Sequence, residues 1–256
     1  MLAPALQMGF RILVNAVSIV LAAGPYVVAG VLAATLVARF ARCGGVVAAC
    51  VAALAPGCDC SMNGFAAALR GCRVPLAGAA LTWGATCNPL TLAITAAVLG
   101  HHLLYARMAG GLVAATAVAV SWSVTSSERM AAAHAHLCAA QDISLRDHLE
   151  SALRLLVPAA CGASLALAVV PHPADAFHSP LVAAIAGAVL SPCSSADPML
   201  AKLLARSQPS QAAFMIAAQC LDVRQLALLQ RHFGSVRTLL ACLSGTAGCV
   251  VAAALA

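Results

Sequence analysis

The chain of 256 residues is 62% hydrophobic and only 9% charged, with a mean hydropathy of +0.95. A soluble protein needs roughly a quarter of its residues charged, so this composition excludes a soluble globular domain and predicts an all-α membrane protein. The net charge of +6 indicates loop charges that face lipid headgroups, and it gives no reason to expect nucleic acid as a partner.

Eight apolar segments follow one another, and a polar stretch at 125–150 divides them into two sets of four. We therefore expect about eight transmembrane helices in two homologous four-helix halves with interrupted helices, 1–124 and 151–256. The first segment is too long for the apolar region of a signal peptide, so we expect it to remain as a spanning helix. The eight segments are Ile12–Ala38, Gly44–Leu69, Pro75–Gly100, Leu103–Val124, Ser151–Val170, Ser179–Leu204, Pro209–Phe233 and Val236–Ala256.

An apolar run in each half is interrupted by Pro or Gly beside thiol, hydroxyl and carboxylate groups. Cys58 and Cys193 lie in these two breaks, 135 residues apart, and the same offset places Cys87 on Asp222. Unwound backbone in a bilayer is tolerated only where protein or a water-filled cavity satisfies it. Two matching breaks therefore predict an internal duplication with a transport substrate site. The breaks read Pro56-Gly57-Cys58-Asp59-Cys60-Ser61-Met62-Asn63-Gly64 and Ser191-Pro192-Cys193-Ser194-Ser195-Ala196-Asp197-Pro198.

Two membrane topologies remain open at this stage. Four full spans in each half give a parallel repeat, whereas a re-entrant hairpin in place of one interrupted span makes the count odd and the repeat inverted. In the first arrangement eight basic residues fall inside and six fall outside, which is a weak positive-inside bias. The outer six are Arg39, Arg42, Arg107, Arg224, Arg231 and Arg237.

Three acidic residues, Asp59, Asp197 and Asp222, lie in the interrupted segments, while the other five lie in the linker and the next loop. A carboxylate at the bilayer centre costs about 2.5–3.5 kcal/mol on insertion scales, so such residues are functional candidates. We expect all three to be candidates for proton exchange. For Asp222, an ion pair with Arg224 is an equally strong structural explanation.

The thiols at the breaks point to a soft ion. In an extended segment Cys58 and Cys60 would face one side with Asp59 opposite, and thiolates select zinc, monovalent copper or similar thiophilic species. At the break in the third segment, Pro89 frees a carbonyl group. The predicted substrate site consists of Cys58, Asp59, Cys60, Ser61, Cys87, Asn88, Pro89, Cys193, Ser194, Ser195, Asp197, Cys220 and Asp222, with Cys58, Cys60, Cys87 and Cys193 as the metal ligands.

The motifs Pro56-Gly57-Cys58-Asp59-Cys60-Ser61, Ala85-Thr86-Cys87-Asn88-Pro89 and Leu190-Ser191-Pro192-Cys193-Ser194-Ser195 resemble the bacterial predicted-permease family that includes the organoarsenical efflux permeases. The resemblance implies an eight-helix permease of two homologous halves that exports trivalent arsenicals or soft metals through thiols. In some relatives it implies a second small membrane subunit. The family usually has Cys-Ser-Cys in the first motif and a second thiol in the other. Here Asp59, Ser194 and Ser195 make the site harder and more acidic, which favours a divalent metal such as zinc.

The sequence therefore predicts a multi-pass permease of the cytoplasmic membrane, with the lipid bilayer and a small inorganic or thiol-bound substrate as partners, and no resident cofactor. It carries no Gly-x-x-x-x-Gly-Lys-Ser/Thr pattern, so we expect no ATPase on this chain and no enzymatic activity. Two alternatives remain: a membrane thiol oxidoreductase that uses Cys58 and Cys60, and a non-transporting metal-binding subunit of a membrane complex. The lack of Cys-x-x-Cys weakens the first.

Overall fold

The computed structural model describes residues 2–41, 45–55, 62–69, 72–125, 177–190, 194 and 196–256, together with residues 146, 150, 154, 157, 161 and 164. These residues are almost entirely helical, and an isolated parallel bridge joins Phe177 to Ala205. The all-helical fold expected from the composition is therefore confirmed for this part of the chain. The predicted linker at 125–150 lies largely outside it.

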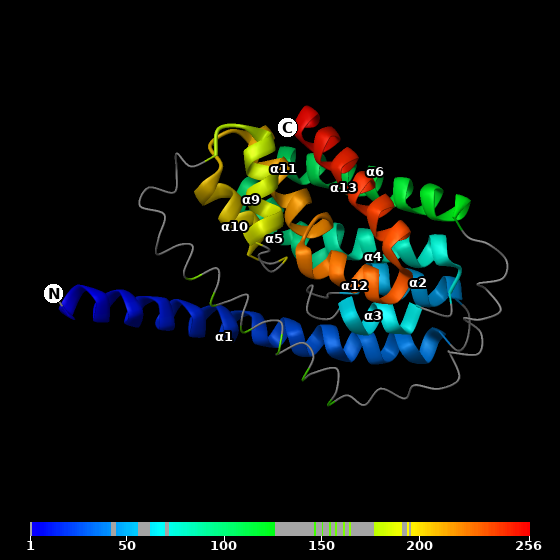
Figure 1. The fold of residues 1–256 in the computed structure, drawn as a ribbon, viewed down its shortest axis with the longest axis horizontal. Helices are drawn as coiled ribbons and strands as arrows, with labels where there is room; N and C mark the ends of the chain where they lie inside the picture. The colour runs from blue at the N-terminus through cyan, green and yellow to red at the C-terminus, as the bar shows by residue number, and fades with distance from the viewer. Residues whose placement is uncertain are drawn as a thin grey trace.

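Figure 1 shows a bundle with one long helix, α1, along its side, and the first part of α1 extends beyond the other helices. In the first half of the chain the helices are α1 (Leu2–Ala41), α2 (Gly45–Leu54), α3 (Met62–Ala68), α4 (Val74–Cys87), α5 (Pro89–Leu99) and α6 (His101–Val124). In the second half they are α9 (Pro180–Leu190), α10 (Asp197–Leu204), α11 (Gln208–Cys220), α12 (Val223–Phe233) and α13 (Ser235–Leu255).

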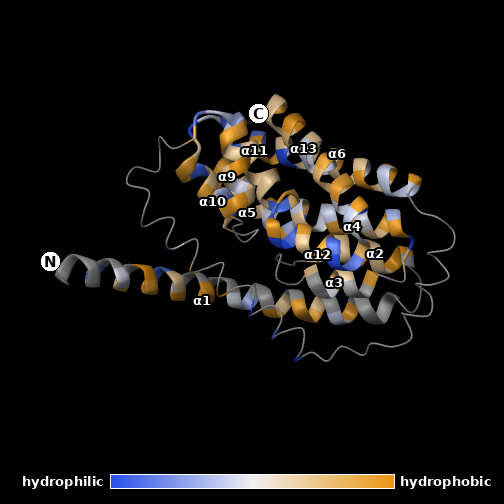
Figure 2. Cartoon of the chain, viewed as in Figure 1, coloured by the Kyte–Doolittle hydropathy of each residue, from blue (hydrophilic) through white to orange (hydrophobic). Residues whose placement is uncertain are grey.

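Three helical segments of the described chain are long and apolar enough to cross a membrane. They are α6, the combined α11 and α12 at Gln208–Phe233, and α13. Their outer surfaces are hydrophobic: Leu112, Leu243 and Val250 are 57%, 61% and 64% exposed, and Figure 2 shows mostly hydrophobic colouring along these helices. An apolar exterior of this kind is what a lipid environment requires, so the chain has the character of a helical membrane protein.

A polar side chain caps the second helix at each of two helix breaks. The break expected at Cys87-Asn88-Pro89 separates α4 from α5, where Asn88 Oδ1 accepts a hydrogen bond from the backbone nitrogen of Thr91 at 2.9 Å. Between α11 and α12, Asp222 Oδ1 accepts one from the backbone nitrogen of Arg224 at 2.7 Å. Such caps satisfy donors that a helix start leaves without partners.

A single glycine turns the chain back at the end of each broken helix. Gly100 and Gly234 have φ angles of 87° and 88°, a left-handed conformation that other residues rarely adopt. After Gly100, α6 returns antiparallel to α4 and α5. Its end packs so closely on the start of α4 that a Cβ at Gly78 would lie 2.6 Å from the Trp122 ring.

Helices α9 and α10 form a hairpin whose two ends meet. The backbone nitrogen of Phe177, just before α9, donates to the carbonyl of Leu204 at the end of α10 at 3.2 Å. With 11 residues in α9, the hairpin extends about 16 Å from its base at 1.5 Å per residue. That length is roughly half of a 30 Å hydrocarbon core.

Helices α6 and α13 cross antiparallel at closely packed glycines. Trp122 Nε1, near the end of α6, donates to the carbonyl of Arg237, near the start of α13, at 2.9 Å. At the crossing, a Cβ at Gly110 would lie 2.7 Å from the carbonyl oxygen of Gly248, and one at Gly248 would lie 2.6 Å from that of Gly110. Small residues are what allow membrane helices to approach this closely.

The buried apolar residues form two clusters, each at the base of one set of short helices. One cluster joins α2 and α3 to the end of α6 and the start of α13, and includes Phe65, Leu69 and Trp122. The other joins α9 and α10 to the start of α6 and the end of α13, and includes Leu103, Leu204 and Phe214. The two clusters therefore lie toward opposite ends of α6.

We expect Gly110→Ala and Gly248→Ala each to lower the melting temperature of the protein in detergent. Overpacking typically costs 1–3 kcal/mol, which exceeds the roughly 0.5–1 kcal/mol gained when alanine replaces a helical glycine. Gly24→Ala is the matched control, because a Cβ there has no atom within 4 Å. Equal melting temperatures for Gly110→Ala and Gly24→Ala would contradict the close crossing.

Candidate functional site

A buried ion pair lies at the tip of the α9–α10 hairpin. Asp197 is the first residue of α10, and Arg107 lies on α6, six residues after its start. Arg107 Nη1 donates to Asp197 Oδ1 at 2.9 Å, and Nη2 donates to Oδ2 at 2.8 Å. Both side chains are 0% exposed. This two-point geometry is the strongest form of an arginine–carboxylate interaction.

The remaining contacts of Arg107 come from the break between α4 and α5. Its Nε donates to the carbonyl oxygen of Thr86 at 2.6 Å, and Nη1 also donates to Thr95 Oγ1 at 3.2 Å. The last four carbonyls of a helix have no partner within that helix. The end of α4 therefore supplies the acceptor that Arg107 requires, and one guanidinium links α4, α5 and α10 to α6.

Asp197 has a third donor on α11. Gln219 Nε2 donates to Asp197 Oδ2 at 2.8 Å, and Gln219 is 0% exposed. The opposite end of the same amide is different: Gln219 Oε1 is buried and has no hydrogen-bond partner in the described structure, and the same is true of Thr91 Oγ1. Buried acceptors of this kind are uncommon in folded proteins.

Cys87 lies against the arginine's own backbone. Its thiol donates to the carbonyl oxygen of Arg107 at 3.7 Å, and the residue is 2% exposed. A Cβ at Gly111 would lie 2.5 Å from Cys87 Sγ, so glycine is required for α6 to approach this thiol. Asn88 is also buried, and its Nδ2 donates to the carbonyl oxygen of Gly84 at 3.1 Å.

The predicted site residues divide into three groups. Cys87, Asn88 and Asp197 lie at one polar cluster with Arg107. Cys220 is buried at 4% exposure and packs where a Cβ at Gly245 would lie 2.8 Å from it, while Pro89 is an exposed first residue of α5 and Ser194 is 2% exposed. Cys58, Asp59, Cys60, Ser61, Cys193 and Ser195 lie outside the described residues. Within the described part, no three His, Cys, Asp or Glu side chains are grouped as metal ligands.

Asp222 has a structural partner. Arg224 Nη2 donates to Asp222 Oδ2 at 2.8 Å and Arg224 Nε donates to the same oxygen at 3.0 Å. The carboxylate also caps α12. Of the two explanations considered for this residue, the structure contains the ion pair with Arg224.

The prediction that Arg107 is a loop charge on the outer face is wrong. The residue lies inside α6 and is fully buried, because its charge is balanced by a carboxylate 90 positions further along the chain. Arginine inside an apolar segment is as costly as aspartate, and this signal was present in the sequence. Gln219 and Thr95 carried no comparable signal, since uncharged polar residues are common in apolar helices.

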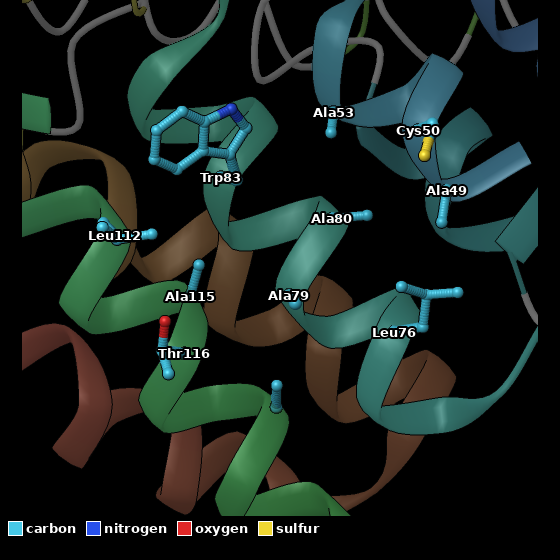
Figure 3. A pocket seen from close by; sticks show the side chains of 11 residues that line it. Ala49, Cys50, Ala53, Leu76, Ala79, Ala80, Trp83, Leu112, Ala115 and Thr116 are labelled. Atoms are coloured by element: carbon cyan, nitrogen blue, oxygen red, sulfur yellow. The ribbon is translucent and has the colours of Figure 1, made fainter. Parts of the chain in front are cut away.

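A separate groove between α2, α4 and α6 has a volume of about 350 Å³. Figure 3 shows its wall of small apolar side chains, with Trp83, Leu112 and Leu76 around it and the exposed thiol of Cys50 at one edge. No charged side chain is among the described residues that line it. Its chemistry suits a lipid chain, and it does not provide a set of metal ligands.

Comparison of the chain with protein-family models, with curated proteins and with solved structures finds no match.

We expect the Arg107–Asp197 pair to show strong thermodynamic coupling. Arg107→Gln or Asp197→Asn alone leaves a buried charge without its partner, which costs about 3–5 kcal/mol, whereas removing both charges costs much less. A double-mutant cycle on the melting temperature in detergent measures this coupling. The exposed pair Glu150–Arg154, with side chains 53% and 77% exposed, is the control, for which about 0.3–0.5 kcal/mol is expected. Additive effects of Arg107→Gln and Asp197→Asn would contradict the pairing.

Proposed function

We propose that the chain is a permease that moves a thiophilic metal or metalloid species out across the cytoplasmic membrane, with a divalent metal such as zinc or a trivalent arsenical as substrate. The observation that carries this proposal is the half-length α9–α10 hairpin whose polar tip is buried against a spanning helix. Irregular backbone and charge at membrane depth are costly, and they occur where a membrane protein handles ions or substrates.

The positions of the helices support a two-half repeat. The starts of α2 and α3 precede those of α9 and α10 by 135 residues, and those of α4, α5 and α6 precede those of α11, α12 and α13 by 134. The capping residues Asn88 and Asp222 are also 134 apart, as are the turns at Gly100 and Gly234. Packing follows the same exchange, because α3 contacts α12 and α10 contacts α5.

This repeat is best explained as inverted. Corresponding helices α6 and α13 run antiparallel, so an axis that relates them is perpendicular to both and lies in the membrane plane. Each half then contains two short helices that enter and leave on one side, a broken span and a final span. We propose that the chain has two re-entrant hairpins in place of two of the eight predicted spans. Inverted repeats with discontinuous helices are a frequent architecture of secondary transporters.

The proposed cargo ligands are the thiols between the paired short helices. Cys58 and Cys60 lie in sequence between α2 and α3, and Cys193 lies between α9 and α10. Thiolates prefer zinc, monovalent copper and trivalent arsenic over hard ions. In this proposal Cys87 and Asp197 belong to the buried polar cluster and do not bind the cargo, because their described contacts are to Arg107 and Gln219.

We expect the double substitution Cys58→Ser/Cys60→Ser to reduce zinc and arsenite flux into sealed vesicles by about tenfold or more, the scale on which changes around a metal alter its binding. Insertion and melting temperature should stay near the wild-type values. Cys50→Ser, which changes an exposed thiol at the apolar groove, is the control and should retain flux. Wild-type flux in the double variant would contradict the thiol site. Zinc binding without flux in the wild type would contradict the permease.

A further inference from the structure

The second hairpin has an ion pair at a place where the first half is apolar. By the offset of 135 residues Asp197 corresponds to Met62, and by the offset of 134 Arg107 corresponds to Ala241. Met62 and Ala241 are both buried in the same apolar cluster. The charges are therefore not required to pack a pair of short helices against this scaffold, and a buried ion pair is itself weak evidence for stability.

The site also contains an acceptor that the ionised pair leaves unused. Both oxygens of Asp197 accept hydrogen bonds, and Gln219 donates one of them through Nε2. Gln219 Oε1 is buried without a partner in the described structure. A protonated Asp197 would need an acceptor for its new O–H group, and rotation of the Gln219 amide would place Oε1 there. The same two side chains can thus satisfy both protonation states of the acid.

Arg107 likewise keeps partners in both states. The Thr86 carbonyl and the Thr95 hydroxyl accept from it independently of Asp197. Protonation would nonetheless leave the guanidinium charge without a counter-charge in an apolar bundle. This arrangement of the helices is then disfavoured, and one in which Arg107 reaches water or another anion is favoured. Proton binding and a shift of the hairpin tip relative to α6 are coupled by that difference.

The charged and titratable groups around Asp197 are few. From α6 it faces Arg107, and the thiol of Cys87 on α4 lies beside Arg107. The described elements α5 and α9 carry no titratable side chain, and Cys220 is the only one on α11. On α10 itself Lys202 lies at the far end, where its Nζ donates to the carbonyl oxygen of Val98 at 3.0 Å. Arg107 is thus the single full charge in contact with Asp197 among the described residues.

We propose that Asp197 is the proton-carrying residue of the permease, with Arg107 as its switchable counter-charge. This inference rests on the proposed function. A proton from water on one side adds to Asp197 Oδ2 when the ion pair opens, and it returns to water on the other side when the pair re-forms. One proton enters and one leaves, and no electrons are transferred. The driving force for metal export is then the proton gradient.

The test uses the purified full chain in sealed vesicles, with zinc and then arsenite as the probe, a set pH difference and the membrane potential clamped. Each pH unit corresponds to 1.36 kcal/mol, or about tenfold in accumulation for each proton exchanged. We expect wild-type accumulation to follow the pH difference. Asp197→Asn should carry downhill flux only, Asp197→Glu should restore the response, and the exposed-site control Glu150→Gln should match the wild type.

A second measurement does not depend on the folding of Asp197→Asn. Infrared difference spectra across a pH titration should show a protonated-carboxyl band that shifts in Asp197→Glu, because the two acids absorb at different frequencies. A band that does not shift, or a wild-type response to the pH difference in Asp197→Asn, would overturn the inference. Wild-type flux that ignores the pH difference would overturn the inference alone. No wild-type flux of either probe would overturn the proposed function with it.

Discussion

The ion pair between Arg107 and Asp197 is the interaction on which the arrangement of the bundle depends. Two charges removed from water must have their donors and acceptors satisfied, or the cost is several kcal/mol for each ion. Here the acceptors come from irregularities: the helix end at Thr86, the hydroxyl of Thr95 and the tip of the α9–α10 hairpin. Each irregularity that appears costly alone thus supplies a partner that the pair requires.

The two halves of the chain use the same local devices and differ in their chemistry. Asn88 and Asp222 cap the broken helices, Gly100 and Gly234 turn the chain, and each half places a glycine of its last helix against the end of the preceding broken helix. The short helices of the first half pack in an apolar cluster, whereas the second hairpin has a polar tip. We interpret this difference as a division of roles between a cargo site and a coupling site.

The sequence could predict the local features and could not predict the long-range ones. Composition was sufficient for a helical membrane protein, and Pro89 with its neighbours was sufficient for the break after α4, because both effects act within a few residues. Asp222 and Arg224 pair within two positions, so that partner was also visible. The hairpin was not, since an apolar run of 26 residues at 179–204 fits a straight span and a hairpin equally well. Arg107 finds its partner 90 residues away, and only the folded chain shows that distance closed.

The central claim is that α9 and α10 enter and leave the membrane on one side and bring Asp197 to Arg107. Lys202, near the base of this hairpin, is the single lysine of the sequence, so labelling with a membrane-impermeant amine reagent gives a direct measurement. His178→Lys adds an exposed lysine at the other end of the hairpin, and Arg73→Lys adds one at the opposite end of the bundle.

Labelling should be done on sealed vesicles of both orientations, with each lysine identified by peptide mass. The account predicts that Lys202 and the H178K site react from the same side, and that the R73K site reacts from the other side. Reaction of the H178K site and Lys202 from opposite sides would show a continuous span from α9 to α10 and would contradict the account.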